Sequence, residues 1–350
     1  MRFRVAVLLS VILLAAACGG APPPITDIAP TPLVTLPADE GPHDSVIEWW
    51  YFNGLLTDDR DQEYSYHYVT FQGEAVGAAV PHLLQASLGD HKAGRHLTGE
   101  QIFLGSLDPG AAGVDAVVNG WVMQGDGEIY SLDFELGGYS LKLTAVSTKP
   151  PVLHQGSGLV HLGPAGDTFY YTRPRLDVKG IIIVNKEQRP VSGAAWMDHQ
   201  WGDVVGQRVG WDWTSLQLDD GSDLMAVLVW DPTDRAPFAG YGTLVSPDGS
   251  VVTLEQNGVF ISPIETWISP ATGIEYPSGW TLTVPSQALN LELTPVLLDS
   301  EFAGSSYTPA VYWEGEVRVA GTRQGRSVGG RGFVELVGYD PQQLEPTSSP

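Results

Sequence analysis

The stretch "EWWYFNGLLTDDRDQEYSYHYVTF" at residues 48–71 sets the pattern for the whole chain. Two runs rich in Trp, Tyr, Phe and Val flank a polar segment, "TDDRDQ", at 57–62. Aromatic and β-branched side chains favour strands, and a polar break between two such runs is typical of a hairpin. In a regular strand Tyr64, Tyr66 and Tyr68 share one face, and His67 lies on the other. The stretch therefore predicts two antiparallel strands joined by a turn.

Short alternating runs of the same kind follow one another to the end of the chain, and no long helix-forming stretch interrupts them. Gly, Asp, Asn and Pro separate these runs, and the hairpin dipeptide "DG" occurs at 220–221 and 248–249. The runs include "GEIYSLDFEL", "YSLKLTAV", "LMAVLVWD", "GTLVSPDGSVVTLE" and "GFVELVGY". We expect an all-β protein made of antiparallel strands.

The pattern of the opening hairpin recurs in "WDWTSLQLDDGSDLMAVLVWD" at 211–231, which has the same order of aromatic strand, acidic turn and second strand. Either a duplication or a chance likeness between two hairpins explains it. About 300 residues is also more than one hydrophobic core usually serves. We therefore predict an N-terminal β domain over 43–190, a C-terminal β domain over 191–340 and a tail over 341–350.

Composition excludes several classes of function. The 350 residues carry 41 acidic against 18 basic side chains, a formal net charge of −23, so we expect no nucleic-acid binding. Cys18 is the single cysteine, which excludes disulfides within the chain and cysteine-based metal sites. The eight histidines do not cluster at ligand spacing, and we expect no metal and no organic cofactor.

The N-terminus predicts an exported, lipid-anchored protein. Arg2 and Arg4 precede the apolar run "VAVLLSVILLAAA", which has the length and flanks of a signal peptide over residues 1–17. The ending "LAAAC" resembles a bacterial lipobox, in which Cys18 would become the lipidated first residue; an ordinary signal peptide is the alternative. Residues 18–42 are rich in Pro and Thr and predict an extended tether. The anchor would be the chain's only contact with the membrane of the cell envelope.

The stretch "GAAWMDHQWGD" at 193–203 places an acid and an imidazole, Asp198 and His199, among tryptophans. By strand alternation His199 shares a face with Trp201, and Asp198 with Trp196. The pair can reach one cavity only if the strand bulges or ends there. By the same rule two later tryptophans, Trp211 and Trp213, share a face. Simple core packing explains any one of these tryptophans, so the case for function depends on the grouping.

The residues of several motifs together resemble the carotenoid 1,2-hydratase (hydroxyneurosporene synthase) and AttH-like family. In order they are "HDSVIEWWYFNGLL" (43–56), "FYYTRPRLDVKG" (169–180), "VSGAAWMDHQWGD" (191–203), "GWDWTSLQLDDGSDLM" (210–225), "YPSGW" (276–280), "YWEGEV" (312–317) and "GRGFVELVGYD" (330–340). The resemblance implies two packed lipocalin-like β barrels with a ligand site between or within them. It also implies addition of water to isoprenoid double bonds without a metal or organic cofactor.

Hydration of an isolated alkene needs a protonated acid and a surface that stabilises a carbocation, and indole faces provide such a surface. We therefore predict Asp198 as the proton donor and His199 as the group that orients it or positions the water. The predicted substrate-binding residues are Glu48, Trp50, Tyr66, Trp201, Trp211 and Trp213, and the expected partner is an apolar isoprenoid or polyketide-like small molecule. Two alternatives remain: a non-catalytic carrier of an apolar molecule, and a carbohydrate-active β protein.

Overall fold

The computed structural model describes residues 30–106, 111–204, 209–303 and 311–341. Within these ranges the chain forms two large sheets, and every pairing between strands is antiparallel. The helical elements of the described chain are four three-residue 3₁₀ turns, η1 (Ala38–Glu40), η2 (His154–Gly156), η3 (Gly163–Ala165) and η4 (Pro285–Gln287). A membrane-spanning helix is not found among the described residues. The predicted all-β class is confirmed.

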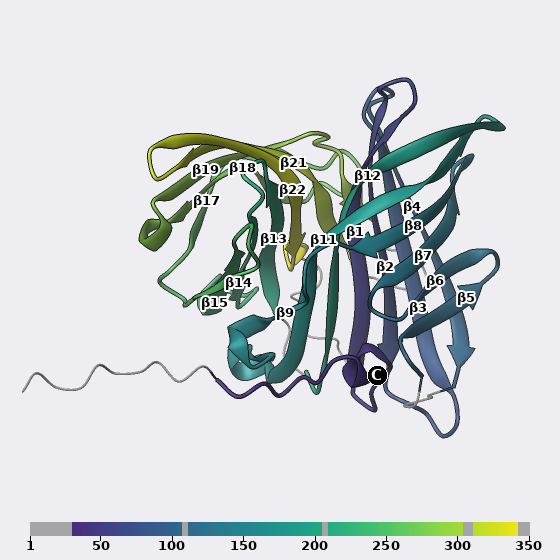
Figure 1. The fold of residues 1–350 in the computed structure, drawn as a ribbon, viewed down its shortest axis with the longest axis horizontal. Coiled ribbons are helices and arrows are strands. Elements are labelled where there is room, and N and C mark those ends of the chain that lie inside the picture. Colours follow the sequence, from purple (N-terminus) through teal and green to yellow (C-terminus); the bar gives the residue numbers. More distant parts are fainter. Residues whose placement is uncertain (1–29, 107–110, 205–208, 304–310, 342–350) are drawn as a thin grey trace, which may run out of the picture.

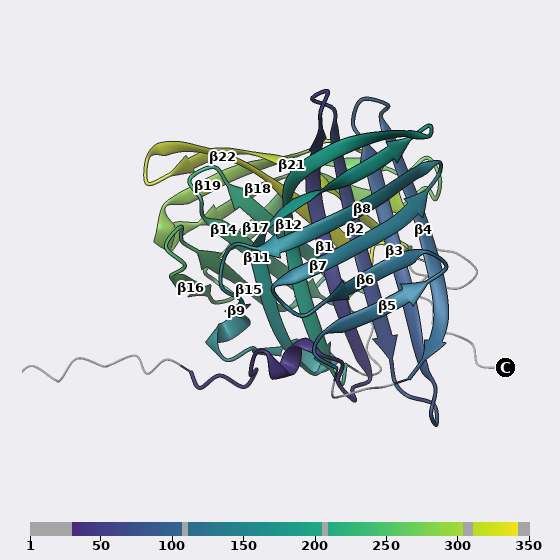
Figure 2. The ribbon, with the colours of Figure 1, turned by 45° about the vertical axis from the view of Figure 1, so that its right-hand side comes forward.

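The first sheet has the strand order β4-β3-β2-β1-β12-β11-β8-β7-β6-β5 and curls into a nearly closed, lipocalin-like barrel (Figures 1 and 2). Two short strands, β9 (Val152–Leu153) and β10 (Leu159–His161), pair with β11. The main strands are β1 (Ile47–Asp58), β2 (Glu63–Gly73), β3 (Val80–Asp90), β4 (Arg95–Gly105), β5 (Val114–Val118), β6 (Trp121–Gly125), β7 (Ile129–Leu136), β8 (Tyr139–Ser147), β11 (Asp167–Val184) and β12 (Glu187–Gly202).

The second sheet has the order β16-β15-β14-β13-β22-β21-β19-β18-β17 and forms a half-barrel beside the first (Figure 1). A two-residue strand, β20 (Glu301–Phe302), pairs with β21. The other strands are β13 (Gly210–Leu218), β14 (Asp223–Trp230), β15 (Pro237–Val245), β16 (Val251–Leu254), β17 (Phe260–Ile268), β18 (Glu275–Val284), β19 (Leu289–Pro295), β21 (Tyr312–Arg323) and β22 (Arg326–Val337). Gly221 and Gly249 take φ near 84° in the turns after β13 and β15, as the "DG" dipeptides predict.

Three hydrophobic cores follow from the alternation of side chains along these strands. One fills the first barrel and includes Tyr64, Tyr66 and Tyr68. A second fills the half-barrel. The third lies between the two sheets and draws residues such as Tyr51 and Trp213 from both. The strands that face this third core are therefore buried on both sides.

The chain passes from the first sheet to the second later than the sequence indicates. We expected a boundary near residue 190, but β12 continues in the first sheet to Gly202, where it pairs with both β1 and β11. The first strand of the second sheet begins at Gly210. The aromatic block "AWMDHQW" thus ends the first barrel instead of opening the second domain, because its neighbours on either side belong to the first sheet.

The segment before β1 also differs from the extended tether predicted for residues 18–42. From residue 30 onward it packs on the first sheet, with Val34 only 3% exposed. Glu40 is buried, forms an ion pair with Arg173, and accepts a hydrogen bond from Tyr171. These contacts hold the segment in place despite its proline content. The predicted signal peptide, Cys18 and all but the first residue of the C-terminal tail lie outside the described residues.

The buried pair between Glu40 and Arg173 predicts a stability effect. Glu40→Gln leaves the Arg173 charge buried without its counter-ion, so the free energy of unfolding should fall by about 3 kcal/mol in urea titrations. Glu187→Gln is the matched control, because Glu187 pairs with Arg60 at the surface and should matter much less. Equal losses in the two variants would show that the N-terminal segment is not fixed by this pair.

Candidate functional site

Strand β12 carries both residues predicted to act on substrate, and its two faces look into different cores. Asp198 pairs with Tyr51 on β1 and with Thr172 on β11, and the pairing runs without a break to Gly202. No bulge turns either side chain around. The expectation that His199 lies within reach of Asp198 is therefore wrong: His199 points into the first barrel, while Asp198 points into the core between the sheets.

Asp198 is 3% exposed and is held by neutral donors. The Tyr170 hydroxyl donates to Oδ2 at 2.7 Å, and the Trp196 indole donates to Oδ1 at 2.8 Å. Burial raises the pKa of Asp198 to about 6, although the hydrogen bonds from Tyr170, Thr172 and Trp196 act against this rise. Asp198 is thus a buried acid beside the Trp196 indole, with a raised pKa.

The second sheet presents two further carboxyl groups to the same core. Glu314 on β21 and Glu335 on β22 are direct cross-strand partners. On the other side of β22, Glu335 is also paired with Trp213 on β13. The Tyr51 hydroxyl donates across the interface to Glu314. The Trp213 indole donates to the Tyr170 hydroxyl at 3.1 Å. We call Asp198, Glu314 and Glu335 the interface acid cluster.

Burial and mutual repulsion favour the protonated forms of these acids. Desolvation raises the pKa of Glu314 well above its ordinary value, and the charge of Glu335 adds to the effect. Desolvation raises the pKa of Glu335 to about 7, and the charge of Asp198 contributes. Among the described residues, no arginine or lysine forms an ion pair with the three carboxyls. The imidazole 3.1 Å from Glu314 belongs to His67, whose pKa is depressed by burial.

A groove of about 430 Å³ opens between the sheets along the same strand faces. Leu55 in this groove shares a face of β1 with Asn53 and Tyr51, and Ala194 shares a face of β12 with Asp198. The Asn53 amide donates to Ser215 across the interface at 2.9 Å, between the groove and Tyr51. The groove is lined by small, aliphatic, polar and charged residues, with the aromatic side chains lying deeper. Its lining is Leu55, Thr57, Arg175, Gly193, Ala194, Gln217, Leu218, Asp219 and Arg331.

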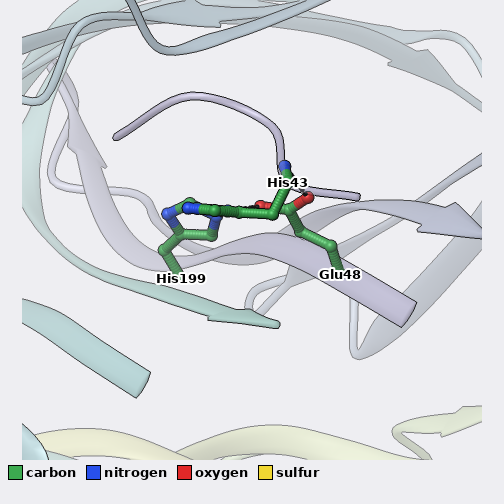
Figure 3. A group of neighbouring side chains, drawn as sticks. All are labelled: His43, Glu48 and His199. Atoms are coloured by element: carbon green, nitrogen blue, oxygen red, sulfur yellow. Dashed lines mark hydrogen bonds and ion pairs between the residues drawn. The ribbon is translucent and has the colours of Figure 1, made fainter. Parts of the chain in front are cut away.

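The first barrel contains a separate polar group at the end where β1 begins and β12 ends. His43, Glu48 and His199 converge there, and Figure 3 shows the two imidazoles and the carboxylate turned toward one another. Their donor atoms lie within 4.8 Å of one another, a spacing that suits one metal ion. Glu48 and His199 are 151 positions apart, so ligand spacing along the sequence could not reveal this group. We call these three residues the barrel group.

The remaining predicted binding residues divide between the two faces. Trp50 and Trp201 stack near His199 in the first barrel, with ring centroids 4.5 and 4.8 Å away. Tyr66 is fully buried in the same core. On the other side, Trp213 and the partly buried Trp211 face the interface, as their predicted shared face requires. The Trp211 indole donates to Glu335 at 3.1 Å, which joins it to the interface acid cluster.

Sequence reasoning missed Glu314, Glu335, Tyr51, Tyr170 and His43. The first two lie inside strands, in "YWEGEV" and "GFVELVGY", where an acid between apolar neighbours is itself unusual. That signal was present but does not show that the two strands pair. His43 gives no such signal, because it lies in a loop before β1.

Comparison with known proteins places the chain in a family. The family model described as AttH-like matches residues 27–339, so the chain belongs to the AttH-like family. The crystal structure of an AttH protein from Nitrosomonas europaea is 29% identical, with a TM-score of 0.77 over 88% of this chain and 97% of that chain. The predicted family resemblance is confirmed.

Two similar proteins are named for an activity. The dehydratase asqC of Emericella nidulans is 27% identical over 207 residues, which span 56% of this chain and 57% of that protein. The structure of kievitone hydratase from Nectria haematococca is 19% identical, covers 89% of this chain and 94% of that chain, and has a TM-score of 0.71. At that identity the second likeness shows the fold alone.

The raised pKa of Glu335 predicts how stability depends on pH. Between its ordinary pKa of 4.5 and about 7, the unfolded chain loses this proton while the folded protein keeps it. The free energy of unfolding of the wild type therefore falls across this range, and Glu335→Gln should remove part of the fall. Urea titrations from pH 4.5 to 8 should show the variant gaining stability relative to wild type as pH rises. A constant difference would mean that Glu335 is ionised in the folded protein.

Proposed function

We propose that this protein adds water to, or removes it from, an isoprenoid-type or polyketide-like small molecule at the interface acid cluster. The observation that carries the proposal is a set of three carboxyl groups between the two sheets, held by hydroxyl and indole donors instead of cations; Asp198 and Glu314 are buried and Glu335 is partly buried. Buried acids without cationic partners retain protons near neutral pH and can donate them. The dehydratase among the relatives supports this reaction class.

In the proposed mechanism the Asp198 carboxyl donates its proton to the less substituted carbon of the double bond. The π electrons form the new C–H bond and leave a tertiary carbocation beside the ionised carboxylate. The indoles of Trp196 and Trp213 present π systems that stabilise such a cation by on the order of 2 kcal/mol each when desolvated.

Water then adds to the cationic carbon, and a carboxylate accepts the proton that the oxonium loses. Glu335 suits this step, because its pKa of about 7 lets it take up and release a proton near neutral pH. Transfer of that proton back to Asp198 restores the starting state. The same steps in reverse dehydrate a tertiary alcohol, so one cluster serves either direction.

The interface groove supports an apolar substrate with a polar end. Its volume lies within the range of ordinary small-molecule sites. Leu55, Ala194 and Leu218 provide apolar surface, while Arg175 and Arg331 lie at its edge as groups for a phenol, carboxyl or carbonyl. A prenylated phenol bound with its alkene directed toward Asp198 is the substrate geometry that we propose.

Asp198→Asn tests the proposal directly. The amide keeps the shape of the side chain but lacks a transferable proton, so turnover should fall by about 10² or more while binding persists. Turnover is measured by mass spectrometry as ¹⁸O incorporation from labelled water into a panel of prenylated phenols and carotenoid fragments. Binding is measured by quenching of tryptophan fluorescence.

Asp212→Asn is the matched control for this variant. Asp212 is a partly buried acid whose pKa is also raised by desolvation, and it also accepts from one phenol and one indole, Tyr339 and Trp230. It faces the core of the half-barrel, away from the interface, so its replacement should leave turnover unchanged. Binding without turnover in the wild type would identify a carrier, and equal loss in both variants would remove the role of Asp198.

We further propose that Cys18 anchors the protein to the cell envelope, on the support of the lipobox-like "LAAAC" and the signal-peptide pattern before it. Cys18→Ser should move the protein from the membrane fraction to the soluble fraction of the expressing cells. Immunoblotting of the two fractions measures this shift. Unchanged partitioning would mean that the lipobox match is a coincidence.

A further inference from the structure

The barrel group brings three metal-ligating atoms to one point. Glu48 Oε1 lies 2.7 Å from His43 Nδ1 and 2.7 Å from His199 Nε2. The residues come from the loop before β1, from β1 and from β12, and Figure 3 shows their inner atoms facing one another. All three residues lie on the barrel side of the sheet, opposite the face that carries Asp198. The interface chemistry proposed above therefore does not use them.

Each imidazole has a polar side chain near its outer nitrogen. His43 Nε2 lies 3.6 Å from the Asp39 carboxylate, and His199 Nδ1 lies 3.2 Å from the Tyr171 hydroxyl. Histidines that bind metals almost always give their other ring N–H to a carboxylate, carbonyl or similar acceptor, which fixes the tautomer and the ring orientation. Both histidines therefore have the surroundings of metal ligands.

The carboxylate of Glu48 is held in the same way. Its second oxygen, Oε2, accepts from the His43 backbone N–H at 2.7 Å and from the Gln72 side chain at 3.2 Å. This leaves Oε1 as the atom directed at the two imidazoles. Stacked indoles fix the rings: Trp201 lies 4.0 Å from His43 at an interplanar angle of 2°, and Trp50 stacks on His199.

The proton positions leave a place for a cation. Tyr171 donates its hydroxyl proton to Glu40, so its oxygen is the acceptor for N–H at His199 Nδ1. With that proton outside, Nε2 presents a lone pair to the carboxylate oxygen of Glu48. When the N–H of His43 is at Nε2 and faces Asp39, His43 Nδ1 likewise presents a lone pair to Glu48. Two lone pairs and a carboxylate oxygen around one point repel one another unless something positive lies between them.

The three inner atoms lie close enough together to share one ion. Both contacts end on the same atom, Glu48 Oε1, and the two rings lie close together, with centroids 5.7 Å apart, inside a barrel lined with aromatic side chains. One divalent ion would satisfy all three inner atoms at once. The partial exposure of His43, whose side chain is 23% exposed, gives an ion a way in from solvent.

We propose that His43 Nδ1, Glu48 Oε1 and His199 Nε2 bind one divalent transition-metal ion. Two imidazoles and one carboxylate form a ligand set that Zn²⁺ and Fe²⁺ accept, with positions left for water or substrate. The ion would join the N-terminal segment to β1 and β12. It would lie on the other side of β12 from the interface acid cluster.

The test uses the whole protein, treated with a chelator and then titrated with ZnCl₂ by isothermal calorimetry. One ion should bind per chain, and the midpoint of thermal unfolding should rise when it binds. Glu48→Gln and His43→Asn should each weaken Zn²⁺ binding by about 100-fold or more, since loss of an outer-sphere contact alone costs 10–100-fold. His161→Gln is the matched control, because His161 also pairs with a carboxylate but is exposed.

X-ray absorption of the zinc-loaded wild type keeps the proposal testable if a variant fails to fold. Imidazole and oxygen scattering, without sulfur, is expected. Absence of imidazole scattering, equal binding by wild type and His43→Asn, or loss of binding in His161→Gln would overturn the site. Asp198→Asn should bind Zn²⁺ like the wild type, so failure of the metal site and failure of the interface mechanism give different results.

Discussion

The structure depends on the second half of strand β12, residues 195–202, being buried on both faces. The residues of this part alternate between the core of the first barrel and the core between the sheets. Strand β1 holds this register without a break, and β11 holds it from Met197 to Gly202, beyond a bulge between Arg173 and Leu176. Adjacent side chains must then enter different surroundings. Asp198 and His199 are adjacent in sequence, yet Asp198 belongs to the interface acid cluster and His199 to the barrel group.

The interface acids have different partners from three other buried acids of the chain. Asp58, Asp223 and Glu40 are each paired with arginine, and those pairs offset the cost of desolvating the carboxylate. Asp198 and Glu335 receive phenol and indole donors instead. Neutral donors offset less of the desolvation free energy of a carboxylate than a cation does, so the protonated form of the acid is favoured. Burial raises the pKa values of Asp198 and Glu335, and no ion pair opposes that rise.

How much of this follows from the sequence depends on the range of each interaction. Strand alternation is local, so the all-β class and the shared face of Trp211 and Trp213 could be predicted. The pairing of strands is not local: nothing in "YWEGEV" indicates that Glu314 lies beside Glu335, or that β12 completes the first sheet. The packing of the segment before β1 depends on Arg173, 133 positions from Glu40, and composition alone indicated a tether.

The interface site belongs to neither sheet alone, so its chemistry depends on how the sheets are held together. The ion pairs that do this lie away from the acids, where Asp223 receives Lys149 and Arg175 from the first sheet, and where Glu63 on β2 receives Arg331 on β22. Cations placed closer would pair with the interface acids and lower their pKa values. Ion pairs at the edge hold the two sheets together, while the acids at the centre have no arginine or lysine partner among the described residues. The interface can therefore be stable and still contain acids with raised pKa values.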